Sequence, residues 1–277
     1  MKQILSLGAG VQSTALLLMS ANGLLPKLDL AIFADTQWEP EEVYTHLDWL
    51  SLEAEKAGIR VVRVTAGNIR EAALSIEGKK FASMPLYTID ENGKKNMVRR
   101  QCTREFKIAP IDKYLRTEVL GLAPGQRSPR EAVLHMWLGI SSNEMGRVKQ
   151  SRDPWKVHRF PLLGDIVHDP MLPKPWKRRD CIEWMQKEYP LLKAPRSACI
   201  GCPYHSNHEW RRIKDDPKAW DDAVDFDRQI RAGTDMTGEA FLHRDCKPLD
   251  EVDLRTDIEK GQGVFSFDDE CDGMCGV

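Results

Sequence analysis

The sequence lacks a long hydrophobic run. No stretch of its 277 residues approaches the roughly 18 consecutive apolar residues that a membrane-spanning helix requires. Residues 1–10, MKQILSLGAG, also lack the apolar segment and small-residue cleavage site of a secretory signal. We therefore expect a soluble protein of the cytoplasm with no membrane partner.

Internal repeats, low-complexity tracts and an obvious linker are missing as well. Hydrophobic residues make up 42% of the chain, which is enough for a full core. We expect an α/β domain over residues 1–165, and no clean linker separates it from the rest of the chain. A helical extension that carries cysteines should follow over residues 166–277 and pack on the same core.

The first third of the chain alternates between strand and helix patterns. Strands are expected at residues 2–7, 28–35 and 60–66, and helices at 11–21, 40–58 and 68–78, the last opened by an Asn68 cap. Strand–helix–strand connections of this kind are right-handed. The pattern therefore predicts a doubly wound, mostly parallel α/β sheet with helices on both faces. Further along we expect a long loop at 79–100, helices at 109–120, 178–189 and 208–231, and a buried strand at 131–140.

Charge is distributed unevenly although the formal net charge is only -2. Residues 94–179 hold 19 Lys and Arg against 8 Asp and Glu, whereas residues 215–272 hold 7 against 18. The basic middle could serve an anionic ligand, or the two halves could simply attract each other. Both interpretations stay open at this point.

The segment that follows the first strand has the composition of a phosphate-binding turn. Small residues separate the strand from the helix, and polar residues open the helix, in the order Gly8, Ala9, Gly10, Val11, Gln12, Ser13, Thr14. Backbone N–H groups can close around a phosphate in such a turn, and the helix N-terminus adds a positive dipole. The lysine of a Walker A loop is missing, which excludes that class. A dinucleotide fingerprint with Asp35 after the second strand is a weak alternative.

Three segments resemble the phosphoadenosine-phosphosulfate-reductase-like family of adenine nucleotide α-hydrolases. GAGVQS resembles the PP-loop S-G-G-x-D-S of N-type ATP pyrophosphatases, although Gly8, Ala9 and Gln12 depart from it. DTQWEPEE (residues 35–42) resembles D-T-G-x-x-x-x-E, and RQCTREFKIAPI (residues 100–111) resembles C-T-x-x-L-K-x-x-P. WLGISSNEMGR (residues 137–147) is loosely similar to a further family segment and contributes Arg147.

The resemblance implies an adenine nucleotide, such as ATP, bound together with Mg²⁺. Its contacts would come from the whole turn, residues 8–14, and from Asp35, Arg104 and Arg147. Lys107 would be catalytic by stabilising charge that develops on the phosphates.

Seven cysteines, an odd number, argue against a disulfide framework in a reducing compartment. Cys199 and Cys202 form a C-x-x-C pair that by itself fits a redox pair, a zinc half-site or an iron–sulfur half-site. The family resemblance implies a [4Fe-4S] cluster with Cys102, Cys199 and Cys202 as ligands. One of the tail cysteines would complete the cluster and the other would be a reactive thiol; we assign Cys275 as the ligand and Cys271 as the catalytic thiol, and the reverse assignment stays open. A cluster with only three protein ligands is a further alternative. Cys181 and Cys246 look structural.

The resemblance implies an enzyme that adenylates a substrate, converting ATP to AMP and pyrophosphate, for sulfur transfer to a nucleic acid or a nucleotide. A sulfur-donor protein is a possible partner under this interpretation, and the chain could form a homodimer. One alternative is a phosphosulfate reductase that attacks sulfur with a C-terminal cysteine. Another is a zinc-bearing nucleic-acid-binding protein without catalysis.

Overall fold

The computed structural model describes residues 1–75, 84–166, 171–232, 238–255 and 259–260. Its centre is a five-stranded parallel sheet with the order β3-β2-β1-β6-β7. The strands are β1 (Lys2–Leu7), β2 (Leu30–Asp35), β3 (Arg60–Thr65), β6 (Leu134–Trp137) and β7 (Lys156–Arg159). The strand order changes direction between β1 and β6, so the predicted doubly wound α/β fold is confirmed.

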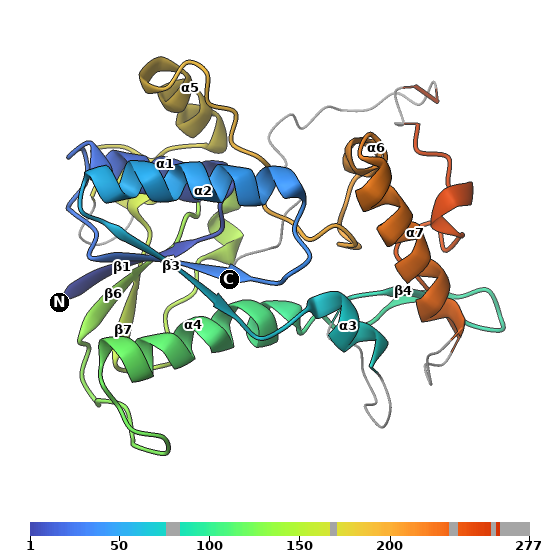
Figure 1. Ribbon diagram of the computed structural model, residues 1–277, viewed down its shortest axis with the longest axis horizontal. Coiled ribbons are helices and arrows are strands. Elements are labelled where there is room, and N and C mark those ends of the chain that lie inside the picture. The colour runs from blue at the N-terminus through green and yellow to red at the C-terminus, as the bar shows by residue number, and fades with distance from the viewer. Residues whose placement is uncertain (76–83, 167–170, 233–237, 256–258, 261–277) are drawn as a thin grey trace.

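Helices cover both faces of this sheet (Figure 1). On one face lie α1 (Val11–Ala21), α2 (Glu41–Lys56) and α5 (Arg178–Glu188). On the other lies α4 (Ala109–Tyr114), flanked by the π-helical segments Thr103–Ile108 and Leu115–Val119. No helix in the described part of the chain is long and apolar enough to cross a membrane.

Alternation along the strands builds the two halves of the core. Leu5 and Phe33 pack into the cluster that α1 and α2 share, whereas Ile4 and Ile32 pack with residues of α4. Successive side chains of a strand point to opposite faces, so one apolar run serves both layers. Cys181 of α5 belongs to the first cluster and is fully buried. This part of the extension therefore packs on the same core as residues 8–14, which are named the glycine turn from here on.

A second, smaller layer stands beside the main sheet (Figure 1). It contains an antiparallel sheet of order β5-β4-β8, made of β4 (Tyr87–Ile89), β5 (Lys95–Met97) and β8 (Glu239–Phe241). The same layer contains three helices, α3 (Ile69–Leu74), α6 (Asn207–Lys214) and α7 (Pro217–Ala232). Trp38, Phe106, Trp210 and Phe226 belong to the apolar cluster of this layer.

Several expectations need correction. The segment 79–100 holds two strands, β4 and β5, rather than a loop throughout. The connection after β6 contains the unexpected strand β7, and the helix expected over 208–231 is two helices separated before Pro217. Proline is favoured in the first turn of a helix and cannot continue one, so α6 ends and α7 begins there. The Asn68 cap is confirmed, because its side chain accepts from the amides of Arg70 and Glu71.

Candidate functional site

The glycine turn is closed by its own hydrogen bonds. The Ser13 hydroxyl accepts from the Gly8 amide at 3.2 Å and donates to the Gly10 carbonyl at 3.3 Å. Ala9 adopts a left-handed conformation with φ 56°, which turns the chain between β1 and α1. Gly10 precedes α1 and provides no side-chain cap, so amides of the first helical turn are left without an intrahelical acceptor. Such donors favour an anion.

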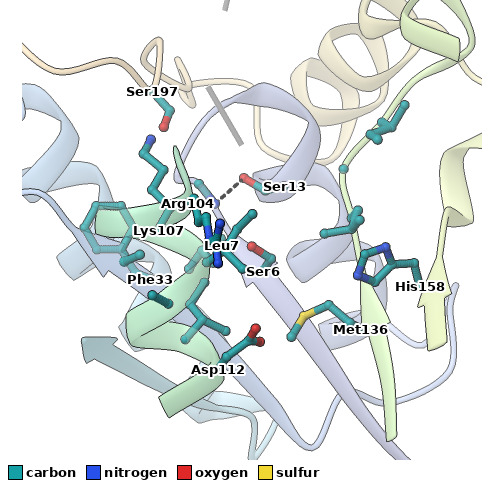
Figure 2. Close-up of a pocket in the computed structure, with 18 of the residues that line it drawn as sticks. Ser6, Leu7, Ser13, Phe33, Arg104, Lys107, Asp112, Met136, His158 and Ser197 are labelled. Atoms are coloured by element: carbon teal, nitrogen blue, oxygen red, sulfur yellow. Dashed lines mark hydrogen bonds between the residues drawn. The ribbon is translucent and has the colours of Figure 1, made fainter. Parts of the chain in front are cut away.

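A cavity of about 1400 Å³ opens beside this turn, at the carboxyl edge of the parallel sheet. Gly8, Gly10 and Ser13 line it, together with Ala34 of β2 and Met136 of β6. Figure 2 shows Ser13, Lys107 and Ser197 toward one end of the pocket and His158 toward the other. Small-molecule sites commonly measure about 300–1,000 Å³, so this cavity has room for a nucleotide and a second reactant.

Cationic side chains from several elements line the cavity. Arg104 and Lys107 come from the π-helical segment that precedes α4, and Arg147 follows β6. Arg147 is paired with Glu144, and Arg196 is paired with Glu209. Arg104 is exposed and Lys107 is half-buried, which leaves both close to solvent at the cavity wall. The excess of positive charge suits a phosphorylated ligand.

At the other end of the cavity, a buried lysine joins two elements. Lys156 Nζ lies 2.5 Å from Asp112 Oδ1 and 3.1 Å from Asp153 Oδ2, which links α4 to β7. Burial raises the pKa of Asp112, and the bond from Lys156 counteracts that effect. Burial lowers the pKa of His158, which bonds to the Lys149 carbonyl. This network was not predicted, because Asp112 is separated from Lys156 by 44 residues in the sequence.

Gln12 ties the turn to the segment after β6. Its Nε2 donates to Glu144 Oε2 at 2.8 Å, and Glu144 also accepts from the Ser141 hydroxyl at 3.2 Å. A Cβ added at Gly139 would lie 3.1 Å from the Ser13 backbone nitrogen, so the end of β6 runs against the turn. Gln12, which departs from the PP-loop pattern, therefore has a positioning contact of its own.

Three of the predicted nucleotide contacts do not line the cavity. Ala9 and Thr14 are fully buried, and the Thr14 hydroxyl lies 2.9 Å from Nε2 of His46 beneath the turn. Asp35 accepts from the Gln37 amide at 2.7 Å and from the Tyr44 hydroxyl at 2.9 Å. The remaining turn residues, with Arg104, Lys107 and Arg147, are among the lining residues.

The segment after β2 contacts the turn that contains the C-x-x-C pair. The Thr36 hydroxyl lies 3.2 Å from Cys199 Sγ, and the Cys199 thiol is 3.7 Å from Glu39 Oε1. The Ile200 amide donates to the Trp38 carbonyl at 2.8 Å. The two motifs recognised separately in the sequence, DTQWEPEE and C-x-x-C, are thus in direct contact.

None of the five cysteines that the structure describes forms a disulfide. Cys199 is buried in the apolar cluster of the smaller layer, and Cys102 packs against that cluster. Among the residues described, no three His, Cys, Asp or Glu side chains are gathered closely enough to hold a metal ion. A three-thiolate ion site is therefore not preformed in this part of the chain. The predicted tail residues Cys271 and Cys275 lie outside the described residues.

The two cysteines expected to be structural differ from each other. Cys181 is fully buried, and burial raises the pKa of its thiol to about 12. Cys246 has a left-handed backbone with φ 54°, and its thiol points to the Thr88 carbonyl at 3.9 Å. Burial raises the pKa of Cys246 as well. Neither environment favours a thiolate.

No model of a known protein family matches the chain, and the search of curated proteins gives no match either. The fold belongs to the class of doubly wound α/β proteins, in which ligands bind outside the carboxyl ends of the strands. The cavity beside the glycine turn occupies that position, between β1 and β6.

Proposed function

We propose that the protein is an enzyme of the PP-loop type, which binds ATP at the glycine turn and adenylates a substrate. The observation that carries this proposal is the cavity beside Gly8, Gly10 and Ser13, with Arg104 and Lys107 in its wall. The uncapped start of α1 supplies amide donors, and the two side chains supply positive charge. These groups suit the phosphates of a nucleotide.

A dinucleotide site has less support. In such a site, an acidic residue after the second strand bonds the ribose hydroxyl. Asp35 has this place in the sequence, yet it does not line the cavity and instead bonds Gln37 and Tyr44. The turn also places a hydroxyl, Ser13, at the helix start where close packing would call for a small apolar residue.

In the proposed reaction, an oxygen of the substrate attacks the α-phosphorus of ATP. A new P–O bond forms as the bond to the bridging α–β oxygen breaks, and pyrophosphate leaves with the electron pair. The turn's amides and the side chains of Lys107 and Arg104 stabilise the charge on that leaving group. An Mg²⁺ ion that accompanies the nucleotide would supply further charge neutralisation. A sulfur nucleophile then attacks the substrate atom that carries the adenylated oxygen. A new bond to sulfur forms as the bond from that atom to oxygen breaks, and AMP leaves with the oxygen and the electron pair.

The iron–sulfur centre is a separate proposal, and no step above depends on it. Its support comes from the position of three cysteines. Cys199 belongs to the apolar cluster of the smaller layer, Cys102 packs against that cluster, and Cys202, three residues after Cys199, is also buried. Anaerobic purification, with iron and acid-labile sulfide measured for the wild type and for Cys102→Ser, tests it. Less than one iron per chain in the wild type would contradict the iron–sulfur proposal. A colourless protein that contains zinc would favour a nucleic-acid-binding protein without catalysis.

Pyrophosphate release tests the main proposal. The purified full chain, incubated with ATP labelled in the γ-position, Mg²⁺ and a nucleic-acid or nucleotide acceptor, should form labelled pyrophosphate. Ser13→Ala should reduce nucleotide binding, whereas Ser75→Ala, at the exposed C-cap of α3 and outside the cavity lining, should not. Sulfite formation from adenylyl sulfate, with no ATP turnover and no ATP binding, would replace the proposal by a reductase.

A further inference from the structure

A short segment from the extension crosses the glycine turn. This segment, residues 194–198, is here named the strap; Ala194, Pro195, Arg196 and Ser197 of the strap line the cavity. A Cβ added at Gly10 would lie 3.2 Å from Ser197 Cβ and 3.5 Å from its backbone nitrogen. A Cβ added at Gly8 would lie 3.4 Å from Ser197 Oγ. The absence of side chains in the turn thus lets Ser197 approach the turn's backbone.

The strap is fixed on both sides of Ser197. On one side, Arg196 pairs with the buried Glu209, which also accepts from the Ser206 amide at 2.9 Å at the start of α6. On the other side, Ala198 is buried, and Cys199 contacts Thr36 at 3.2 Å. Anchors on both neighbours hold Ser197 in place before any ligand arrives, which is the arrangement that favours tight binding.

The Ser197 hydroxyl is available to a ligand. Ser197 is half-buried, and none of the described residues forms a hydrogen bond with its side chain. Figure 2 shows it at the same end of the pocket as Ser13 and Lys107. A hydroxyl can donate to a phosphate oxygen from the side opposite the turn's amides.

We infer that Ser197 is a phosphate-contact residue. Its hydroxyl binds the pyrophosphate portion of the nucleotide on the side opposite the amides of the glycine turn. The inference rests on the proposed function, since it takes the turn to hold phosphates. Ser197 would add a donor that the sequence motif does not contain, and the strap would place it. A ligand without the terminal phosphates, such as AMP, would gain little from it.

The test compares the binding of ATP, inorganic pyrophosphate and AMP by calorimetry. Removing a hydrogen bond to a charged group typically weakens binding by roughly ten- to a hundredfold. Ser197→Ala should therefore weaken ATP and pyrophosphate by about that factor and leave AMP within about twofold. Ser128→Ala, which removes a hydroxyl outside the cavity lining, is the matched control and should bind all three ligands as the wild type does.

The pair Ser197→Thr and Ser197→Val guards against a folding defect, because the two side chains have the same shape and differ in the hydroxyl. Threonine should bind pyrophosphate about tenfold or more tightly than valine. Equal affinities, or an equal loss for AMP, would overturn the role of Ser197 while leaving ATP binding by the wild type intact. A wild type that binds neither ATP nor pyrophosphate would instead overturn the proposed function.

Discussion

The ring of Trp38 occupies the space in which a side chain at Gly201 would lie. A Cβ built at Gly201 overlaps the Trp38 ring, and both residues are buried. Trp38 follows β2, and Gly201 lies between Cys199 and Cys202 in the C-x-x-C turn. The close approach of the two segments is thus possible only with glycine at this position.

Gly201→Ala should therefore destabilise the protein by about 1–3 kcal/mol, because a methyl group is forced into a filled core. Urea unfolding, followed by fluorescence, measures the change. Gly146→Ala is the control, since no atom lies within 4 Å of a Cβ added there and its φ is not in the left-handed region. If both variants unfold at the same urea concentration, Trp38 does not pack against Gly201 as described.

The stability of the protein should fall in mild acid through His46. Burial lowers the pKa of His46 to about 4, from an ordinary value of 6.5. Between these two values the unfolded chain binds a proton that the folded chain does not, so the free energy of unfolding declines as the pH falls from 6.5 toward 4. We expect a loss on the order of 1–3 kcal/mol from this group, measured by urea unfolding across that range.

His46→Gln should flatten this part of the pH profile, since it removes the titrating group and keeps an amide for the Thr14 hydroxyl. The contact between Thr14 and His46, at 2.9 Å, lies under the glycine turn. A variant whose pH profile is identical to that of the wild type would show that folding does not lower the pKa of His46.

Lys107→Met should weaken ATP binding by roughly tenfold and leave the unfolding midpoint nearly unchanged. The side chain is half-buried and its charge faces the cavity, so its loss removes a cation from the phosphate end. Equilibrium dialysis with labelled ATP measures the affinity. Lys187→Met on α5, whose side chain is 82% exposed and outside the cavity lining, is the matched control. A similar loss in both variants would point to net charge rather than to a contact.

Thiol reactivity should differ sharply between Cys102 and Cys181. Cys102 is partly exposed, whereas Cys181 is fully buried with its pKa raised to about 12. Iodoacetamide should label Cys102 in the native protein and should label Cys181 only after unfolding, as read by peptide mass spectrometry. Labelling of Cys181 at the rate of Cys102 in the folded protein would contradict the packing of α5. Protection of Cys102 in iron-loaded protein would support the iron–sulfur proposal.

The sequence by itself determined the local elements of the fold and the alternation of strands and helices in the first third of the chain. A short apolar run followed by small residues and a helical pattern is a local signal, so β1, the glycine turn and α1 were predictable. The Asn68 cap was predictable for the same reason. β7 was not, because three of its four residues are polar and Lys156 is buried in ion pairs with Asp112 and Asp153.

Only the tertiary structure decided which distant residues share the candidate site. Chain spacing carries no signal that Gln12 meets Glu144, that Thr14 faces His46 rather than a ligand, or that Ser197 lies against Gly8 and Gly10. These contacts arise because the helices pack on both faces of one sheet, and the carboxyl ends of its strands bring loops from the whole chain to one edge.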